Sequence, residues 1–327
     1  MLKKILITGG AGFIGSHLVE SLIKKNKIII IDDLSTGNMK NLEKVISHKN
    51  LKFIKKDLNS KKLDKYFKNV SIVYHLAAQS DIIPSVKNPK KYFDSNVNAT
   101  VNLLEYCKKY DVRKIVYAAS SSCYGVPKKY PTNENEKIDT RYPYSFTKYI
   151  AEQTLLHWGQ IYNINIKSLR LFNVFGPRVR TIGHYGAMFG VFLAQKANKF
   201  PLTIVGDGKQ MRDFTFVSDV VDAFILAGKT KTDKKIFNIG TGKPVSINYV
   251  ASLISKNKIN IPKRPGEPDK TYANILLAKK DLKYYPKVKF KDGLKVMLDG
   301  LSSWKKAPLW TKKSIKKNTK DWFKYIK

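Results

Sequence analysis

The sequence is poor in cysteine and has no long hydrophobic run. Its 327 residues include two cysteines, Cys107 and Cys123, which argues against a disulfide framework and a paired-cysteine metal site. Both lie in apolar segments, so we interpret them as core thiols and predict no metal centre. No apolar stretch approaches the ~18 residues that span a membrane. Because the N-terminal MLKKILITGG shows no signal-peptide cleavage site, we expect a cytoplasmic protein with no membrane partner.

Arginine and acidic residues are scarce relative to lysine. The chain carries 61 Lys and Arg against 25 Asp and Glu, a formal net charge of +36, and seven of the 61 are arginine. Arginine is the usual side chain for forked contacts with phosphates and bases. Because the lysines are spread over nearly every segment, we interpret them as solvated surface and predict no nucleic-acid partner. A basic nucleic-acid scaffold is the alternative of another class.

Short apolar segments alternate with helical patterns through the first half of the chain. The strand-like segments are 5–8, 28–32, 51–57, 71–77, 114–120 and 166–172. Such alternation is typical of a doubly wound parallel sheet. The predicted fold class is therefore α/β, a doubly wound parallel Rossmann sheet with a smaller α+β substrate-binding lobe.

A glycine-rich turn follows the first predicted strand and opens a helix. In TGGAGFIGSH, Gly9, Gly12 and Gly15 have the spacing GxxGxxG, and Gly10 completes an overlapping GxGxxG. Glycines here permit a tight turn, let backbone N–H groups approach a pyrophosphate and let the helix pack close to the sheet. The turn therefore predicts a dinucleotide site.

Acidic residues end the second and third predicted strands. At Asp32 and Asp33, a carboxylate accepts hydrogen bonds from the adenosine ribose and repels a 2′-phosphate. No arginine lies nearby in the sequence, so we expect NAD rather than NADP. Asp57 ends the third strand and is placed to meet the adenine, with a helix N-cap as the alternative.

The chain is predicted to form two lobes. After residue 176 the strands shorten, and glycine and proline become more frequent. We predict that residues 1–172 form the NAD-binding Rossmann domain and that 212–238 return to it. Residues 173–211 and 239–327 are then predicted to form the substrate-binding lobe with the C-terminal helices.

A tyrosine and a lysine stand four residues apart in TRYPYSFTKY, just after a proline. Residues i and i+4 share one face of a helix, so the ammonium of Lys148 can lie near the phenol of Tyr144. A nearby positive charge is expected to lower the pKa of Tyr144 from about 10. Taken alone, this spacing also arises by chance in a lysine-rich chain.

With HLAAQ at 75–79 and ASSSCYG at 119–125, these motifs resemble the extended short-chain dehydrogenase/reductase family, specifically its NAD-dependent nucleotide-sugar epimerases and dehydratases. The resemblance runs from Leu2 to about Lys283 and is closest to the UDP-glucose 4-epimerases and their UDP-N-acetylglucosamine and UDP-glucuronate relatives. It implies NAD-dependent 4-epimerisation of a UDP-hexose or UDP-N-acetylhexosamine through a transient 4-keto sugar, with NAD regenerated.

The resemblance also implies roles for individual residues. Tyr144 would take the proton of the sugar 4′-hydroxyl, Lys148 would bind the nicotinamide ribose, and Ser120 would hydrogen-bond the reacting oxygen. Ser121 and Ser122 are alternatives to Ser120. The implied cofactor-binding residues are Gly9, Gly12, Phe13, Ile14, Gly15, Asp32, Asp33, Asp57, Leu58, Leu76, Ala77, Ala78, Gln79, Asn96, Tyr144 and Lys148. The implied substrate-binding residues are Ser120, Ser121, Ser122, Asn173, Thr203, Val205, Arg212, Arg264 and Thr271.

Several substrate contacts follow from the same resemblance. Asn173, Arg212 and Arg264 stand where relatives hold the diphosphate, and LTIVGDG at 202–208 resembles the strand that pairs with the uracil edge through its backbone. Thr271 matches the residue that walls the sugar pocket near C2, and its small side chain predicts that N-acetylated sugars are accepted. The family's Asn-Leu pair is replaced near Gly186, a departure that affects the base and sugar pockets.

The loop after the catalytic serine separates the reactions of the family. Dehydratases and decarboxylases carry acidic residues there, whereas Ser121 and Ser122 in this chain favour plain 4-epimerisation. A 4,6-dehydratase, decarboxylase or reductase of the same family is the first alternative, because fold does not determine function. A non-catalytic dinucleotide-binding protein is another, although Tyr144 and Lys148 argue against it. Helices 96–110 and 145–163 carry apolar residues on more than one face, and the resemblance implies that they pair across a two-fold axis into a four-helix bundle, so we expect a homodimer.

Overall fold

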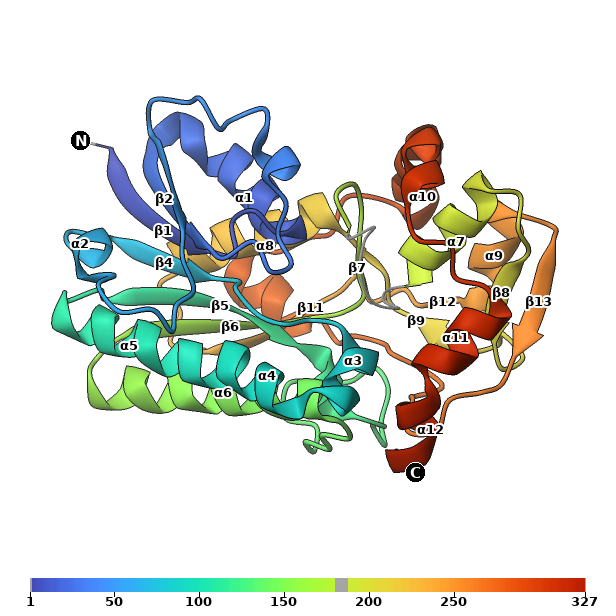
Figure 1. Cartoon of the computed structure of the whole chain (residues 1–327). Helices are drawn as coiled ribbons and strands as arrows, with labels where there is room; N and C mark the ends of the chain where they lie inside the picture. Colours follow the sequence, from blue (N-terminus) through green and yellow to red (C-terminus); the bar gives the residue numbers. More distant parts are fainter. Residues whose placement is uncertain (1, 180–187, 327) are drawn as a thin grey trace.

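A parallel sheet forms the centre of the molecule. The computed structural model describes residues 2–179 and 188–326, and within them seven strands have the order β11-β6-β5-β4-β1-β2-β3 (Figure 1). They are β1 (Lys3–Thr8), β2 (Asn26–Asp32), β3 (Leu51–Lys55), β4 (Ile72–His75), β5 (Lys114–Ser120), β6 (Asn165–Leu171) and β11 (Ile236–Ile239). The order reverses between β1 and β4, and ligands bind beyond the carboxyl ends of strands at such a switch point. The predicted fold class is confirmed.

Helices cover both faces of this sheet, α1 and α8 on one and α5 and α6 on the other (Figure 1). They are α1 (Phe13–Leu22), α8 (Val217–Lys229), α5 (Ala99–Lys109) and α6 (Pro143–Ile161). Ile7 packs into the buried cluster under α1 and α8, whereas its neighbour Leu6 packs into the cluster under α5 and α6. Since successive strand side chains point to opposite faces, burial of both faces explains the continuous apolar runs.

Shorter helical elements connect these layers. They are η1 (Ile23–Lys25), η2 (Met39–Leu42), α2 (Asp64–Phe67), α3 (Ile82–Lys87), α4 (Pro89–Phe93), η3 (Asp94–Asn98) and η4 (Ser121–Tyr124). The π-helical η3 runs directly into α5, and η4 follows the last residue of β5.

A second group of elements packs beside the sheet around its own buried apolar cluster (Figure 1). Its short strands pair as β8 (Leu202–Val205) with β13 (Lys258–Ile261), β9 (Met211–Arg212) with β12 (Val245–Ser246), and β10 (Thr215–Phe216) with β7 (Val174–Phe175). Its helical elements and those near the C-terminus are α7 (Met188–Ala197), α9 (Ile247–Ile254), α10 (Phe290–Asp299), η6 (Leu301–Lys306), α11 (Lys312–Asn318) and α12 (Lys320–Tyr325). The remaining element, η5 (Ala278–Leu282), packs with the central sheet in the cluster under α1 and α8. Trp322 of α12 is fully buried against Tyr142, the residue that precedes α6.

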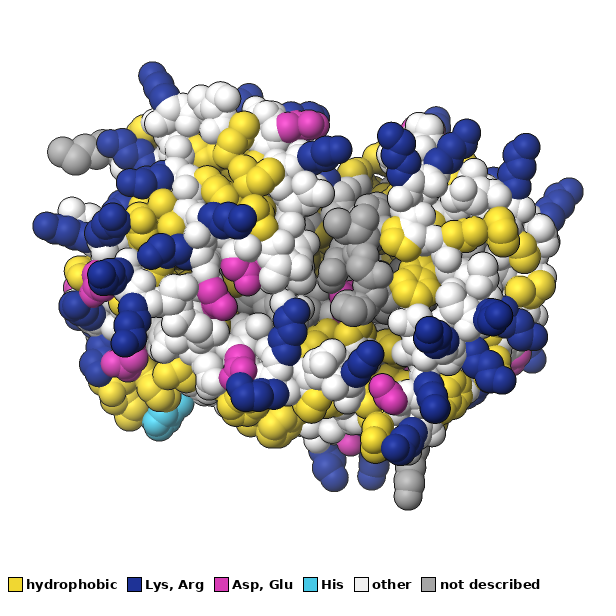
Figure 2. All heavy atoms as spheres, in the orientation of Figure 1, with side chains coloured by type: hydrophobic (Ala, Val, Ile, Leu, Met, Phe, Trp, Pro, Cys, Tyr) yellow, Lys and Arg dark blue, Asp and Glu magenta, His cyan; other side chains and the backbone are white. Residues whose placement is uncertain are grey.

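The surface is strongly basic. Lysine and arginine side chains are spread over both parts of the face shown in Figure 2. Among residues 2–179 and 188–326, no helix is long and apolar enough to cross a membrane. Over the same residues, no cluster of histidine, cysteine and acidic side chains is arranged to hold a metal ion.

Candidate functional site

A cavity of about 610 Å³ extends from the turn after β1 to the second group of elements. Every predicted cofactor-binding, catalytic and substrate-binding residue lines it, with the exception of Asn96. Asn96 is 1% exposed and lies behind the wall. The departure noted near Gly186 lies outside the described residues.

The glycine-rich turn brings the backbone close to the start of α1. Gly9 has a φ of +70°, and a Cβ there would lie 2.7 Å from the backbone nitrogen of Ala77. A Cβ at Gly15 would lie 2.1 Å from the carbonyl oxygen of Gly9. Side chains at either position would therefore push the turn, the next loop and the helix apart. What remains is a concave backbone surface at a helix N-terminus, which suits a pyrophosphate.

The acidic residues at the strand ends are fixed by backbone N–H groups. Asp32 accepts from Ala11 at 2.9 Å through Oδ2 and from Leu34 at 2.8 Å through Oδ1. Burial raises the pKa of Asp32, and these two hydrogen bonds oppose the rise. The neighbouring Asp33 is exposed and also lines the cavity. Asp57 Oδ1 accepts from the Asn59 N–H at 2.8 Å, so its carboxylate shapes a turn at the cavity wall.

Asn96 supports the loop that follows β4. Its Oδ1 accepts from the Gln79 N–H at 2.8 Å, and its Nδ2 donates to Thr147 Oγ1 at 3.0 Å. Thr147 belongs to α6, next to the predicted catalytic residues. Asn96 therefore joins the predicted cofactor wall to the predicted catalytic helix.

The three predicted catalytic residues come from two adjoining elements. Ser120 ends β5, and its Oγ lies 2.8 Å from Ser122 Oγ. Tyr144 lies in the first turn of α6, where Pro143 fits because that position needs no backbone donor. Lys148 lies one turn later and is 4% exposed, with its Nζ 4.2 Å from the centre of the Tyr117 ring.

Electrostatics at this site differ from the expectation based on spacing. Burial raises the pKa of Tyr144, and a hydrogen bond with Ser120 opposes that rise. Burial also lowers the pKa of Lys148 to about 7. The prediction that Lys148 gives Tyr144 a lowered pKa is therefore wrong for the protein alone, because desolvation of the buried phenol dominates.

The two arginines that are predicted to hold the diphosphate lie at the other end of the cavity. One carboxylate interacts electrostatically with both. Arg264 forms an ion pair with Glu267, Nε to Oε1 at 2.7 Å. Arg212 donates to the Met211 carbonyl at 2.9 Å, and burial lowers its pKa while Glu267 opposes the change. Sequence reasoning missed Glu267, although it stands three residues after Arg264 in the same motif.

The substrate-side polar residues are bonded to each other. Asn173 Nδ2 donates to Thr271 Oγ1 at 2.8 Å, and the Asp213 N–H donates to the same hydroxyl at 3.2 Å. The hydroxyl of Thr271 is therefore already engaged. These bonds hold Asp213, which precedes β10, and Asn173 next to Thr271, which follows β13 in the chain.

Comparison with known proteins identifies the family. A model of the NAD dependent epimerase/dehydratase family matches residues 5–240. This range includes the glycine-rich turn, the serine loop and the helix that carries Tyr144 and Lys148. The chain belongs to the NAD-dependent epimerase/dehydratase family. The family predicted from the motifs is confirmed, and with it an enzyme that uses NAD.

Similar members of the family include several 4-epimerases. A putative UDP-glucose 4-epimerase of Methanocaldococcus jannaschii is 37% identical over 310 residues, 91% of this chain and 98% of that protein. The UDP-N-acetylglucosamine 4-epimerase from Methanobrevibacter ruminantium M1, solved in complex with UDP-N-acetylmuramic acid, has a TM-score of 0.88 at 34% identity and covers 92% of this chain and 99% of its own. The UDP-glucuronic acid 4-epimerase from Bacillus cereus, solved with UDP-glucuronic acid and NAD, has a TM-score of 0.86 at 32% identity with 92% and 99% coverage.

Proposed function

We propose that this protein is an NAD-dependent 4-epimerase of a UDP-hexose or a UDP-N-acetylhexosamine. The observation that carries the proposal is the shared cavity, in which the glycine-rich turn, Ser120, Tyr144 and Lys148 meet and the loop after Ser120 supplies serines instead of acids. The similarity to named 4-epimerases supports it. A UDP-glucuronic acid decarboxylase of Arabidopsis thaliana is 33% identical, so decarboxylation is the competing reaction that an experiment has to separate.

The residues of the cavity fit NAD. The cradle formed by Gly9, Gly12 and Gly15 would hold the pyrophosphate, and Asp32 or Asp33 would accept the ribose hydroxyls. Bound NAD supplies an acceptor and donor of hydride at the sugar C4. Lys148 would donate to the nicotinamide ribose. Tyr144 would take and return the proton of the 4′-hydroxyl, and Ser120 would hold that oxygen.

The open edge of β8 offers hydrogen bonds to a base. The Leu202 N–H donates to the Asn257 carbonyl. In the parallel register, which sets Thr203 opposite Ile259, the backbone groups of alternate β8 residues, Leu202 and Ile204, face β13. Thr203 and Val205 therefore turn their backbone groups to the opposite edge, which lines the cavity.

Two glutamine side chains hydrogen-bond to two of the backbone groups on this edge. Gln195 Oε1 accepts from the Thr203 N–H at 3.1 Å, and Gln210 Nε2 donates to the Val205 carbonyl at 2.8 Å. The other two groups of the edge are the Thr203 carbonyl and the Val205 N–H, one acceptor beside one donor. This pair matches the N3–H and a neighbouring carbonyl of uracil. Neither glutamine was identified from the sequence, because their contacts span separate elements.

The decisive experiment is product analysis with purified protein. UDP-glucose, UDP-N-acetylglucosamine and UDP-glucuronic acid are each incubated with the protein, and products are separated by chromatography and weighed by mass spectrometry. We expect a 4-epimer of unchanged mass, with only partial reduction of bound NAD in the absorbance spectrum. A product that has lost water indicates a dehydratase, and one that has lost carbon dioxide indicates a decarboxylase.

We also propose the predicted homodimer, formed through α6 and the continuous run of α4, η3 and α5. Phe93 of α4 and two residues of α6, Phe146 and Ile161, are large apolar side chains with 40%, 45% and 58% exposure. Pairing across a two-fold axis would cover them. Light scattering at micromolar concentration is expected to give twice the chain mass, and a monomer mass counts against the proposal.

The free, buried Cys107 and Cys123 suit a reducing compartment, so we propose that the protein is cytoplasmic, which cell fractionation tests.

A further inference from the structure

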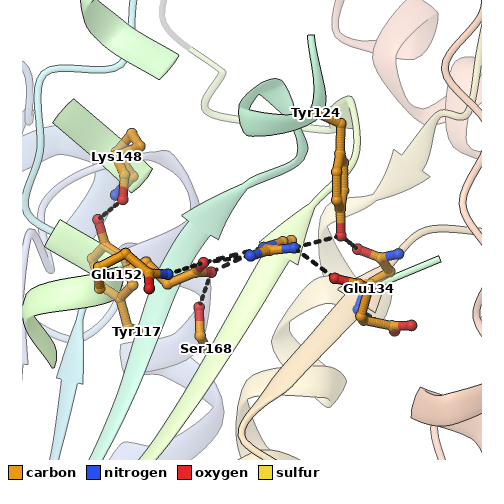
Figure 3. Close-up of polar contacts among 9 residues, drawn as sticks. Tyr117, Tyr124, Glu134, Lys148, Glu152 and Ser168 are labelled. Atoms are coloured by element: carbon orange, nitrogen blue, oxygen red, sulfur yellow. Dashed lines mark hydrogen bonds and ion pairs between the residues drawn. The ribbon is translucent and has the colours of Figure 1, made fainter. Parts of the chain in front are cut away.

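A buried ion pair lies beneath the catalytic helix. Glu152 of α6 and Arg170 of β6 have side chains that are 2% and 3% exposed, and Arg170 Nη2 lies 2.6 Å from Glu152 Oε1. The guanidinium Nε also donates to both carboxylate oxygens, at 3.3 and 3.1 Å. Ser168 Oγ donates to Glu152 Oε2 at 2.6 Å. The carboxylate is thus fixed from two sides (Figure 3).

Stability alone does not account for such a pair. Desolvating two charges costs several kcal/mol, so buried ion pairs are often replaceable by apolar side chains without loss of stability. Glu152, however, stands one helical turn after Lys148 on the same side of α6. The pair therefore lies next to a buried amine that the proposed function requires.

Few groups around Lys148 are charged. The Tyr117 ring of β5 lies against its Nζ, and burial raises the pKa of that phenol well above its usual value. Burial lowers the pKa of His75, on β4, to about 3, so the imidazole is neutral. Burial raises the pKa of Tyr144, and the charge of Asp81 raises it further, so this phenol is also neutral near pH 7. The negative charge that opposes the loss of the Lys148 proton is that of Glu152.

The other end of Arg170 reaches the serine loop. Its Nη1 donates to the Tyr124 hydroxyl at 2.9 Å, and the Tyr124 hydroxyl donates to Asn238 Oδ1 at 2.7 Å. Tyr124 ends η4, the turn that starts directly after Ser120. Burial alone would lower the pKa of Arg170, but its hydrogen bonds to Glu152 raise it, so the guanidinium stays charged.

We propose that Glu152 and Arg170 are positioning residues for the catalytic centre. Glu152 favours the protonated form of the buried Lys148 amine, and Arg170 holds the Glu152 carboxylate in place while tying the serine loop to α6. The role of Lys148 in this inference rests on the proposed function. Neither residue of the pair lines the cavity, so the pair acts through Lys148 and Tyr124.

The test compares NAD affinity across pH in variants of the whole protein. Because the pKa of Lys148 lies near 7, the affinity of the wild type should fall as pH rises through that region and the ammonium is lost. In Glu152→Gln the fall should begin at lower pH, by about half a unit or more. Glu43→Gln, which removes an exposed carboxylate far from this pair in the chain, is the control and should follow the wild type.

A second variant separates the charge effect from folding. Glu152→Gln leaves Arg170 buried without its partner and is expected to lower the unfolding temperature. Glu152→Gln combined with Arg170→Met removes both charges, so stability should recover while the shift in pH remains. A double variant that folds like the wild type and keeps the wild-type pH profile overturns the proposal.

The outcome is independent of the substrate. If the wild type and Glu152→Gln show the expected pH profiles of NAD affinity but the wild type forms no 4-epimer, the proposed function fails and the positioning role stands. If it forms the 4-epimer and the variants show no shift, the positioning role fails alone. For an active enzyme, the alkaline limb of kcat should move in the same direction as the limb of NAD affinity.

Discussion

His75 Nδ1 lies 2.7 Å from Thr8 Oγ1, where β4 and β1 end side by side at the switch point of the sheet. On the other side of the ring, Nε2 lies 2.9 Å from Thr100 Oγ1. Thr100 donates its own proton to the Asn96 carbonyl at 2.6 Å, so its oxygen accepts from Nε2–H. Nδ1 is then the acceptor of the Thr8 hydroxyl proton. The network holds a neutral histidine between the cofactor turn and η3.

This arrangement predicts acid sensitivity of the fold. Burial lowers the pKa of His75 to about 3, against about 6.5 for the unfolded chain. Below pH 6.5 the unfolded state binds the proton and the folded state does not, so stability falls as pH falls toward 3, by about 1.4 kcal/mol per pH unit. Between pH 7 and pH 5, His75 alone should remove about 2 kcal/mol.

The measurement is urea unfolding at these two pH values for the wild type and His75→Gln. The variant loses hydrogen bonds and is less stable at pH 7, but it lacks the titrating group, so its additional loss at pH 5 should be smaller by about 2 kcal/mol. Equal losses in both proteins would show that His75 is not the source of the acid sensitivity.

A second prediction concerns the glycine cradle. Gly15→Ala should destabilise the fold by about 1–3 kcal/mol, because the new methyl group meets the Gly9 carbonyl at 2.1 Å and the backbone has to move. NAD affinity should fall with it. Gly300→Ala is the matched control, since its Cβ would meet only Met297 O at 3.7 Å. Calorimetric titration with NAD measures the affinity of both variants. An unchanged affinity for Gly15→Ala contradicts the proposal that the glycine cradle holds NAD.

A third prediction isolates proton transfer. Tyr144→Phe removes the hydroxyl and keeps the ring, so epimerisation should fall by about 10²-fold or more while NAD stays bound. Tyr325→Phe, at a tyrosine that is 59% exposed, should leave the rate unchanged. Initial rates with UDP-glucose and the absorbance of bound NAD are the measurements. A Tyr144→Phe enzyme with more than about a tenth of the wild-type rate is incompatible with a general-base role.

Local sequence patterns were sufficient for the sheet and most of the cavity wall. The apolar runs and the glycine turn carry their information over a few neighbouring residues, because a strand and a tight turn are specified locally. The same holds for Tyr144 and Lys148, which share a helix turn. The acidic residues at the ends of β2 and β3 could be placed because a strand ends at a fixed edge of a parallel sheet.

Properties that depend on burial or on distant partners could not be read in this way. The pKa of Tyr144 was predicted with the wrong sign because the spacing shows a nearby lysine but not the desolvation of the phenol. Asn96 was predicted from the family resemblance, but its hydrogen bond to Thr147 of another helix was not. Glu152 and Arg170 meet across α6 and β6, and each alone resembles an ordinary charged residue.

The last prediction concerns the breadth of sugars that the enzyme accepts. Thr271 lines the cavity, and its hydroxyl accepts from Asn173 Nδ2 at 2.8 Å, so a small side chain is fixed at the predicted C2 wall. We expect the wild type to accept UDP-N-acetylgalactosamine as well as UDP-galactose, and Thr271→Tyr to exclude the N-acetylated sugar by occupying its space. Thr271→Ser keeps both the hydroxyl and the small volume, so it should retain the wild-type preference. The measurement is kcat/KM for the two sugars in all three proteins. Position 271 is not the gate if the wild type ignores the N-acetylated sugar, or if tyrosine changes the ratio by less than about threefold, under ~0.7 kcal/mol.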